Sequence, residues 1–296
     1  MKFAYYPGCS QQASAIDYGM STLALCSTMG IQLEEIPGWS CCGSSPAHSI
    51  SEELAAALSA RNLDLAARRG FDTVVTPCPS CLSNLRAARA RMRDGHFRER
   101  VNGLLDEPAP EDLPEAISVI QAIARRFDAR AIQGHVKKGL AGLRLACYYG
   151  CLMSRPPEIM NFGDPENPTL MESLLAACGA EMVDFPLKTV CCGASYGVPE
   201  QDLTAINTGR ILELARNVGV DALVVACPLC QMNLDLRQRQ ADAVTGEFFQ
   251  MPVPYYSQLM GLAFGIAPQH LGLDRLCVSP VPLLAKIGVE MTGGLA

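Results

Sequence analysis

The sequence predicts an α/β fold made of two homologous halves, each with a mostly parallel sheet. A cysteine pattern occurs twice along the chain, short β-rich runs precede the repeated cysteines, and amphipathic helical segments follow them. Strands that alternate with helices are typical of parallel sheets. The chain has 296 residues, of which 49% are hydrophobic and 18% charged, so it is long enough for two units with hydrophobic cores.

Ten of the fourteen cysteines fall into two sets with the same order: a lone cysteine, a vicinal pair and a Cys-x-x-Cys. The first cysteine set is Cys9, Cys41, Cys42, Cys78 and Cys81. The second cysteine set is Cys151, Cys191, Cys192, Cys227 and Cys230. The flanks agree, since "YYPGC" matches "YYGC", "CCGSS" matches "CCGAS", and "GFDTVVTPCPSC" matches "GVDALVVACPLC". A repeat of this length indicates two homologous halves.

Short β-rich runs predict the strands that lead into these cysteines. They cover residues 2–6, 72–76, 143–149 and 221–226. Ala- and Leu-rich segments at residues 51–69 and 199–217 predict amphipathic helices. Each Cys-x-x-Cys is expected to open a helix, where the dipole and free N–H groups stabilise a thiolate. Because ligands of parallel sheets gather at the carboxyl ends of strands, we expect the sulfurs to meet there.

Charge and proline between residues 94 and 114 mark the join, and a helix from about residue 113 to 126 is expected to bridge the halves. The predicted division is a first cysteine-rich domain at 1–100, a linker with the bridging helix at 101–142, a second cysteine-rich domain at 143–245 and a C-terminal extension at 246–296. The apolar stretch 251–284, rich in Pro and Gly, is a candidate docking surface or a cover over the cleft between the halves.

Composition narrows the class of protein. A net charge of -6 and 24 spread Lys and Arg residues argue against nucleic acid as the partner. The longest apolar run, "LMGLAFGIA", is shorter than the roughly 20 residues that span a bilayer. No export signal is recognisable at the N-terminus, so a cytoplasmic location is expected. Since reducing compartments do not maintain disulfide frameworks, the cysteines are expected to bind metal, act as catalytic thiols or fill the core.

Five cysteines per half favour iron–sulfur chemistry. A structural zinc site is complete with four ligands, so a fifth thiolate in both halves exceeds what zinc needs. A zinc-stabilised interaction module remains the alternative. The C-x2-C-x2-C run of bacterial ferredoxins is absent from the sequence.

The two CCG elements, each with a preceding Tyr-Gly-Cys or Tyr-Pro-Gly-Cys and a following Cys-Pro-x-Cys, resemble those of the heterodisulfide reductase B-subunit family. The resemblance extends from residue 3 to about residue 236. It implies two homologous Rossmann-like CCG domains related by pseudo-two-fold symmetry. It also implies two noncubane 4Fe-4S clusters, one per cysteine set, which face each other and split or form a disulfide by one-electron steps from both sides.

The resemblance also implies partners. No Gly-x-Gly-x-x-Gly follows a strand, so electrons must come from or go to another protein. A ferredoxin-like C-subunit and a flavin-containing A-subunit are expected. The 19 Arg and 5 Lys residues are typical of a GC-rich bacterial genome and favour a sulfur-oxidising heterodisulfide-reductase-like complex with a lipoate-binding protein. Reduction of a methanogenic coenzyme heterodisulfide and an electron-relay role in a 2-hydroxyacid (glycolate or lactate) dehydrogenase are the alternatives.

Four further residues are candidates for the site. Gly43 and Gly193 follow the vicinal cysteines and are expected to let the backbone approach a cluster and donate N–H groups to sulfide, or else to serve as turn glycines. His48 is a candidate proton donor, with a solvated or helix-capping histidine as the alternative. Tyr196 is a candidate for substrate contact.

The remaining cysteines and tyrosines are expected to be structural. Cys147 forms a C-x3-C with Cys151 and is expected to be a neighbouring or substitute thiol, because five ligands exist without it. Cys26 and Cys178 are expected to fill the core, and Cys277 is not interpreted. The tyrosines before the lone cysteines are expected to pack or hydrogen-bond near the sulfurs; they are Tyr5, Tyr6, Tyr148 and Tyr149.

Overall fold

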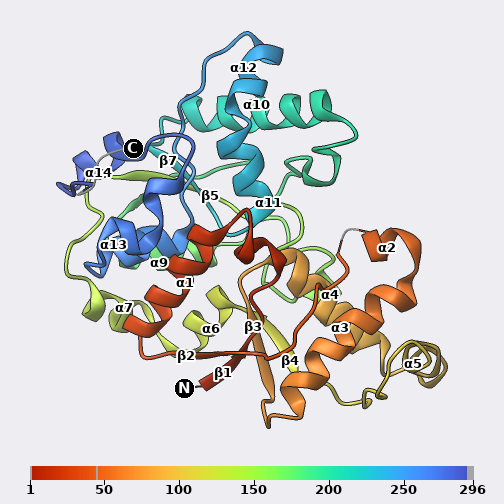
Figure 1. The fold of residues 1–296 in the computed structure, drawn as a ribbon. Helices are drawn as coiled ribbons and strands as arrows, with labels where there is room; N and C mark the ends of the chain where they lie inside the picture. Colours follow the sequence, from red (N-terminus) through yellow and green to blue (C-terminus); the bar gives the residue numbers. More distant parts are fainter. Residues whose placement is uncertain (1, 45, 292–296) are drawn as a thin grey trace.

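The computed structural model describes residues 2–44 and 46–291 and contains two parallel sheets (Figure 1). The first sheet has the order β2-β1-β3-β4 and the second the order β6-β5-β7. The strands are β1 (Lys2–Tyr5), β2 (Gln32–Glu35), β3 (Thr73–Thr76), β4 (Glu115–Ser118), β5 (Arg144–Tyr148), β6 (Glu181–Met182) and β7 (Ala222–Val225). All named pairs are parallel. The predicted α/β class and the four predicted strands are therefore confirmed.

Helices connect the strands of both sheets. In the first half they are α1 (Ile16–Thr28), α2 (Pro46–Ile50), α3 (Glu52–Ala67), α4 (Pro79–Arg91), α5 (Gly95–Asn102), α6 (Val119–Arg126) and α7 (Ala129–His135). In the second half they are α8 (Pro157–Met160), α9 (Leu170–Ala177), α10 (Gln201–Asn217), α11 (Pro228–Gln231), α12 (Gln238–Thr245), α13 (Tyr256–Ala263) and α14 (Val281–Lys286). The helices predicted at 51–69 and 199–217 are α3 and α10, and both Cys-x-x-Cys motifs open a helix as expected.

The bridging helix expected at 113–126 is wrong in its first part. Residues 115–118 form β4, which pairs in register with β3, and the helix begins only at Val119. Ser118 caps that helix by accepting the N–H of Gln121 at 3.1 Å. A short apolar run fits a buried strand as well as a helix, because its periodicity does not distinguish the two.

The C-terminal segment completes the second sheet in the same way. The N–H groups of Leu223 and Val225 donate to the carbonyl oxygens of Pro252 and Pro254, at 3.1 and 3.0 Å, and Tyr255 forms a parallel bridge with Val225. Prolines lack an N–H and are tolerated only at a sheet edge, which is where this segment lies. Two segments outside the predicted domains, residues 115–118 and 252–255, are thus hydrogen-bonded parts of the two sheets.

The N-terminal and C-terminal segments pack together between the halves. Helix α1 lies beside α13 (Figure 1), and the hydroxyl oxygens of Ser21 and Ser257 are 2.7 Å apart. Every residue of α13 is buried, and one hydrophobic core extends from Phe3 through both helices to Leu284. The interpretation of this part of residues 251–284 as a docking surface is therefore wrong, because it forms the interior between the halves.

Candidate functional site

Both cysteine sets lie at equivalent places in the two sheets. In the first sheet β1 and β3 are neighbours, and the chain continues from β1 to one side and from β3 to the other. The carboxyl ends of such a strand pair flank the crevice where doubly wound sheets bind ligands. Cys9 follows β1 and Cys78 follows β3. Cys151 and Cys227 follow β5 and β7, so each half places its sulfurs at its own crevice.

Within each set, three cysteines are buried and two reach the surface. In the first set the buried members are Cys42, Cys78 and Cys81, and the exposed ones are Cys9 and Cys41. In the second set the buried members are Cys192, Cys227 and Cys230, with Cys151 half-buried and Cys191 exposed. The Sγ atoms of Cys42 and Cys81 are 3.4 Å apart, and those of Cys192 and Cys230 are 3.6 Å apart. The two sets therefore share one geometry.

The thiols within a set share protons, and this shifts their pKa values in opposite directions. Hydrogen bonds from Cys41 and then Cys81 lower the pKa of Cys42 to about 4. A hydrogen bond from Cys151 lowers the pKa of Cys191 to about 6. The pKa of Cys81 is raised, first by its hydrogen bond with Cys42. Neighbouring thiolates repel one another, so five thiols in one set can all be deprotonated only when a metal centre neutralises their charge. A set of five cysteine sulfurs therefore fits an iron–sulfur cluster.

The glycine before each lone cysteine lies against sulfur. Gly8 has φ +76°, and a Cβ there would lie 2.9 Å from the Sγ of Cys81. Gly150 has φ +67°, and a Cβ there would lie 2.7 Å from the Sγ of Cys230. Such a backbone conformation and such a close approach both require glycine. Sequence reasoning missed these two positions, although the repeated Gly-Cys was a signal for them.

The two predicted glycines adopt turn conformations and also meet sulfur through their N–H groups. Gly43 and Gly193 have φ +77° and +81°. The N–H of Gly193 lies 3.3 Å from the Sγ of Cys191, and the N–H of Gly43 hydrogen-bonds the sulfur of Cys41. The pKa of Cys41 is raised, first by its hydrogen bond with Cys42 and then by burial, and the Gly43 N–H only opposes this shift. A Cβ at Gly193 would lie 3.3 Å from the backbone of Thr204. Both interpretations of these glycines, turn and N–H donor, thus have a structural basis, and their role at a cofactor stays a prediction.

The asparagine of the repeated Cys-Pro-x-Cys-x-x-Asn holds the vicinal cysteines in place. The amide group of Asn84 donates to the carbonyl oxygen of Cys42 at 3.1 Å. That of Asn233 donates to the carbonyl oxygen of Cys192 at 3.2 Å and lies 3.6 Å from its Sγ. Sequence reasoning did not assign a role to either residue, although their place in the repeat was visible.

Two of the four tyrosines before the lone cysteines hydrogen-bond the loops that carry the vicinal cysteines. Tyr6 donates to the carbonyl oxygen of Ser40 and Tyr148 to that of Val190, in each case the residue before the vicinal cysteines. Cys147 is fully buried, and burial, followed by the charge of Glu172, raises its pKa. Cys147 therefore lies in the hydrophobic core, and its role as a neighbouring or substitute thiol stays a prediction. Cys26 and Cys178 are likewise buried in the core, as expected.

His48 and Tyr196 lie beside the two CCG turns and are exposed. The N–H of His48, in α2, donates to the carbonyl oxygen of Gly43 at 3.1 Å, and its side chain faces solvent. The N–H of Tyr196 donates to the carbonyl oxygen of Gly193 at 2.9 Å, and half of its side chain, 50%, is exposed. Neither residue is buried in a crevice, so both roles stay predictions.

One tyrosine connects the two cysteine sets. The hydroxyl group of Tyr18, in α1, lies 3.2 Å from the carbonyl oxygen of Pro77 and 3.0 Å from that of Ala226. Pro77 and Ala226 directly precede Cys78 and Cys227. The two Cys-Pro-x-Cys loops therefore meet at a single hydroxyl group.

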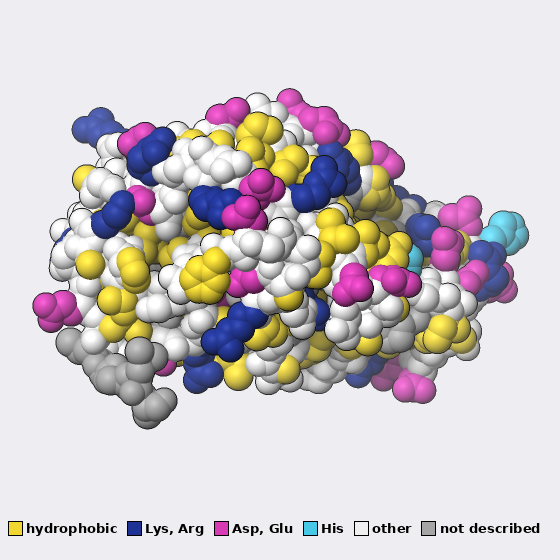
Figure 2. Space-filling view, turned by 90° about the horizontal axis from the view of Figure 1, so that it is seen from above, with side chains coloured by type: hydrophobic (Ala, Val, Ile, Leu, Met, Phe, Trp, Pro, Cys, Tyr) yellow, Lys and Arg dark blue, Asp and Glu magenta, His cyan; other side chains and the backbone are white. Residues whose placement is uncertain are grey.

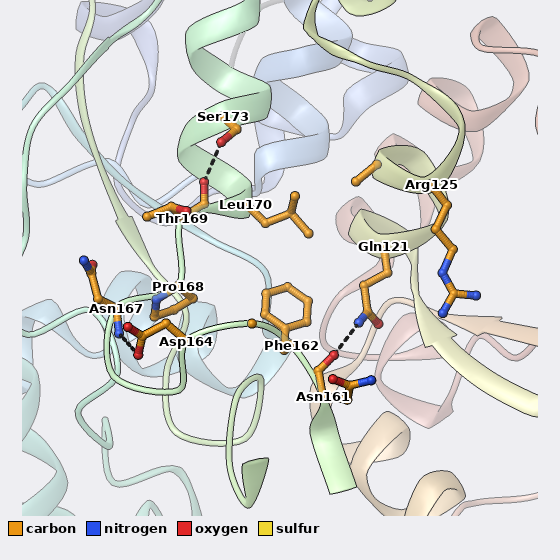
Figure 3. Close-up of a pocket in the computed structure, with 12 residues that line it drawn as sticks. Gln121, Arg125, Asn161, Phe162, Asp164, Asn167, Pro168, Thr169, Leu170 and Ser173 are labelled. Carbon is orange, nitrogen blue, oxygen red and sulfur yellow. Dashed lines mark hydrogen bonds between the residues drawn. The ribbon is translucent and has the colours of Figure 1, made fainter. Parts of the chain in front are cut away.

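One cavity and the surface charges show no relation to the two cysteine sets. A cavity of about 440 Å³ lies between α6, the loop 161–169 and α9, and no cysteine lines it (Figure 3). On the face shown in Figure 2, Lys and Arg side chains lie interspersed with Asp and Glu and with hydrophobic side chains.

Within residues 2–44 and 46–291, no group of three or more His, Cys, Asp or Glu side chains is arranged to hold a single metal ion. No helix of this described part is both long and apolar enough to cross a membrane.

Comparison with known proteins agrees with the repeat. The CCG cysteine-rich domain family matches residues 3–86 and 145–235. The chain is 34% identical to the Wolinella succinogenes "8-methylmenaquinol:fumarate reductase membrane anchor subunit", over 95% of this chain and 99% of that protein. It is 32% identical to the B subunit of the ferredoxin/F(420)H(2)-dependent CoB-CoM heterodisulfide reductase of Methanosarcina acetivorans, over 88% of each chain.

A solved structure of similar fold is that of a hypothetical protein from Helicobacter pylori. Its TM-score is 0.73 at 14% sequence identity. The match covers 94% of this chain but only 52% of the other, so this chain spans about half of that protein. At this identity the likeness shows the fold alone.

Proposed function

The chain belongs to the heterodisulfide reductase B-subunit family, with its paired CCG cysteine-rich domains, and we propose that it handles a sulfur–sulfur bond between two clusters. Membership makes it an iron–sulfur redox subunit of an oxidoreductase. The finer proposal is that each cysteine set holds one noncubane 4Fe-4S cluster. The observation that carries it is the meeting of both Cys-Pro-x-Cys loops at Tyr18, which brings the two sets together.

Paired sites suit the electron count of the reaction. Cleaving a disulfide takes two electrons and two protons and yields two thiols, whereas an iron–sulfur cluster transfers one electron at a time. The clusters, when bound, would supply the two electrons, one from each side. The ten cysteines would hold them, and the N–H groups of Gly43 and Gly193 would donate to sulfur. His48 and Tyr196 lie beside the first and the second CCG turn. In this proposal His48 would donate a proton to a released thiolate, and Tyr196 would contact the substrate.

The relatives support a place in a larger complex. Several are named as subunits of heterodisulfide or fumarate reductases. We propose a multi-subunit reductase in which a ferredoxin-like C-subunit and a flavin-containing A-subunit deliver or accept the electrons. Lipoate-bound sulfur, presented by a lipoate-binding protein, is the substrate we propose for the bacterial sulfur-oxidising form of such a complex.

A second function is an electron relay without a substrate of its own. One relative, 34% identical to this chain, is named as an 8-methylmenaquinol:fumarate reductase subunit, and electron transfer from a quinol to fumarate involves no sulfur–sulfur bond. In that case another subunit would bind the organic acid, as it would in a 2-hydroxyacid dehydrogenase. The cysteine sets would hold clusters in both cases, so the two functions differ only in whether sulfur from outside reaches iron.

A spectroscopic titration distinguishes the two functions. Anaerobically purified, oxidised protein is mixed with dihydrolipoamide, with glutathione, or with an alkyl alcohol as the control. Direct sulfur chemistry predicts that the thiols, but not the alcohol, change the electron paramagnetic resonance (EPR) signal of a cluster. An unchanged signal with all thiols, together with normal iron content, would reject the sulfur chemistry and support the relay.

A further inference from the structure

Tyr18 is built into the contact between the halves. Its side chain is 1% exposed, so its hydroxyl is isolated from solvent. The single hydroxyl proton is shared between the carbonyl oxygens of Pro77 and Ala226, one from each half. Both carbonyls belong to the residue before the first cysteine of a Cys-Pro-x-Cys motif. A shift of Tyr18 would therefore move both loops at once.

Tyr255 stacks on Tyr18 and presents an unpaired hydroxyl to the same region. The two rings are parallel, with centroids 4.0 Å apart and planes inclined by 1°. Tyr255 is fully buried, and within the described part of the chain its hydroxyl has no hydrogen-bond partner. Burial raises the pKa of Tyr255 well above its usual value, and the negative charges of Asp17, Cys227, Cys78 and Cys230 add to this. Cysteines of both sets are thus near enough to Tyr255 to act on its charge.

A buried hydroxyl without a partner is unfavourable unless it has one in the functional state. With so high a pKa the hydroxyl of Tyr255 stays protonated at neutral pH, so it acts as a hydrogen-bond donor and not as an acid. The neighbouring Tyr256 provides the contrast. It too is fully buried, but its hydroxyl interacts with that of Tyr18, and the cysteine that adds to the effect of burial on its raised pKa is Cys26, in the core outside both sets.

We propose that Tyr18 and Tyr255 link the two cluster sites: Tyr18 is a positioning residue that fixes the spacing of the two Cys-Pro-x-Cys loops, and the Tyr255 hydroxyl donates a hydrogen bond to sulfur at the cluster sites. This inference rests on the clusters of the proposed function, and not on its sulfur substrate. Hydrogen bonds to sulfur raise the reduction potential of a cluster, because they stabilise the more negative reduced form.

The hydroxyl of Tyr255 is tested with Tyr255→Phe and the matched control Tyr256→Phe. Each variant removes one buried hydroxyl from the same end of α13. We expect both to keep the iron content of the unaltered protein. In an EPR-monitored redox titration, Tyr255→Phe shifts the midpoint potential of at least one cluster to a more negative value, and Tyr256→Phe leaves both potentials unchanged. Equal potentials in all three proteins, or equal shifts in both variants, would overturn the hydrogen bond to sulfur.

The positioning role of Tyr18 is tested with Tyr18→Phe, and Tyr5→Phe is the control. Tyr5 is also buried, but its hydroxyl donates to Gln11, at 2.7 Å, within the first half alone. With both clusters reduced, Tyr18→Phe changes the magnetic interaction between them, seen as altered splitting and relaxation of the EPR signal, at unchanged iron content. Tyr5→Phe leaves this interaction as it was. An unchanged interaction in Tyr18→Phe would overturn the positioning role.

The outcomes for this inference and for the proposed function are separable. Protein that binds no iron would reject the clusters themselves. Protein that binds iron, responds to no thiol and still shows the shift in Tyr255→Phe would retain the tyrosine link and lose only the sulfur substrate.

Discussion

The two halves agree around the sulfurs and differ one helical turn away. Arg86 and Asp235 lie five residues after the last cysteine of each set. Arg86 lies in the continuous helix α4 and donates to the carbonyl oxygen of Ala116, at 2.7 Å, and to that of Met160. Asp235 lies in a π-helical turn, Met232–Leu236, and accepts the N–H groups of Cys277 and Val278, at 2.7 and 3.0 Å.

This difference separates what the site needs from what the scaffold needs. The cysteines, Gly8 and Gly150, and Asn84 and Asn233 occupy equivalent positions and make equivalent contacts. Arg86 and Asp235 are opposite in charge, and each attaches its helix to a different neighbouring segment. Arg86 contacts β4 and α8, and Asp235 contacts the C-terminal segment at residues 277–278. Residues that touch sulfur or hold the cysteine loops are therefore the same in both halves, and residues that join the halves to their surroundings have diverged.

The largest expected effect tests the equivalence of the two glycines. Gly8→Ala and Gly150→Ala each bring a Cβ to within 2.9 and 2.7 Å of sulfur at positive φ. We expect each variant to lose one of two clusters, which is about four of about eight irons per chain. The measurement is iron and acid-labile sulfide after anaerobic purification.

Gly30→Ala is the control for backbone strain in this comparison. Gly30 also has positive φ, +68°, but a Cβ there would meet nothing within 4 Å. We expect it to lower stability by about 1 kcal/mol and to keep its iron. Iron loss in Gly30→Ala equal to that in Gly8→Ala would show that strain, not contact with sulfur, decides the result.

The next effect concerns Asp17, a buried acid in the first half, and its contrast with an ion-paired acid in the second half. Burial raises the pKa of Asp17 from the usual 3.8 to about 6. The charge of Asp235 also raises this pKa, and that of Arg275 lowers it. The amide of Gln258 donates to the Asp17 carboxylate. In the second half Glu172 is paired with Lys188 at 2.8 Å. The folded state holds the Asp17 proton more tightly than the unfolded chain does, so protonation of Asp17 stabilises the fold. This stabilisation is fully present below pH 3.8 and is lost as pH rises through about 6.

Asp17→Asn should therefore flatten the pH dependence of unfolding. Relative to the unaltered protein, the variant gains about 3 kcal/mol between pH 4 and pH 7, measured as the free energy of unfolding at each pH. Asp202→Asn, at an exposed position in α10, is the control and should show no such gain. A gain of equal size in Asp202→Asn would contradict the burial of Asp17 as the cause.

A smaller effect distinguishes the two asparagines. Asn233 is fully buried, whereas Asn84 is half-buried, although both donate to the carbonyl of a vicinal cysteine. We expect Asn233→Ala to lower the free energy of unfolding by about 3 kcal/mol and Asn84→Ala by about 1 kcal/mol, because water replaces the lost donor only at the less buried site. Thermal unfolding under anaerobic conditions measures both, and an equal loss would contradict this reason.

The smallest effect is expected at the edge of the first sheet. Arg125 holds Glu115 of β4 through two hydrogen bonds, at 2.7 and 2.8 Å, and both side chains are exposed. The edge of the second sheet carries prolines instead. Arg125→Gln should cost less than about 1 kcal/mol of stability and leave the iron content unchanged, because water screens an exposed ion pair. A larger loss in the thermal unfolding curve would mean that the edge depends on this pair.

The sequence showed the two cysteine sets more clearly than it showed the edges of the two sheets, and the role of these sets as cluster ligands stays a prediction. The ten cysteines could be identified because their spacing is copied, and their strands because β-rich runs precede them. The strand at Glu115–Ser118 could not be told from the start of a helix, since its two apolar residues, Ala116 and Ile117, are adjacent and do not alternate with polar ones. The segment before Tyr255 contains prolines, which mask its place at a sheet edge.

The tyrosine link was invisible for a different reason. Tyr18 and Tyr255 stand near opposite ends of the chain, and neither lies in the cysteine repeat. Their contact forms only when α1 packs beside α13, so no local sequence pattern predicts it. Asn84 and Asn233, in contrast, were repeated in the sequence, and only their hydrogen-bond partners had to come from the structure.

The most direct measurement of the central claim is the iron and acid-labile sulfide content of three anaerobically purified proteins: the unaltered chain, Cys81→Ser and Cys230→Ser. If each cysteine set holds its own cluster, the unaltered chain contains about eight irons, and each variant about four, with the EPR signal of the other half retained. Stoichiometric zinc in place of iron, or an iron content that either substitution leaves unchanged or abolishes completely, would contradict the account.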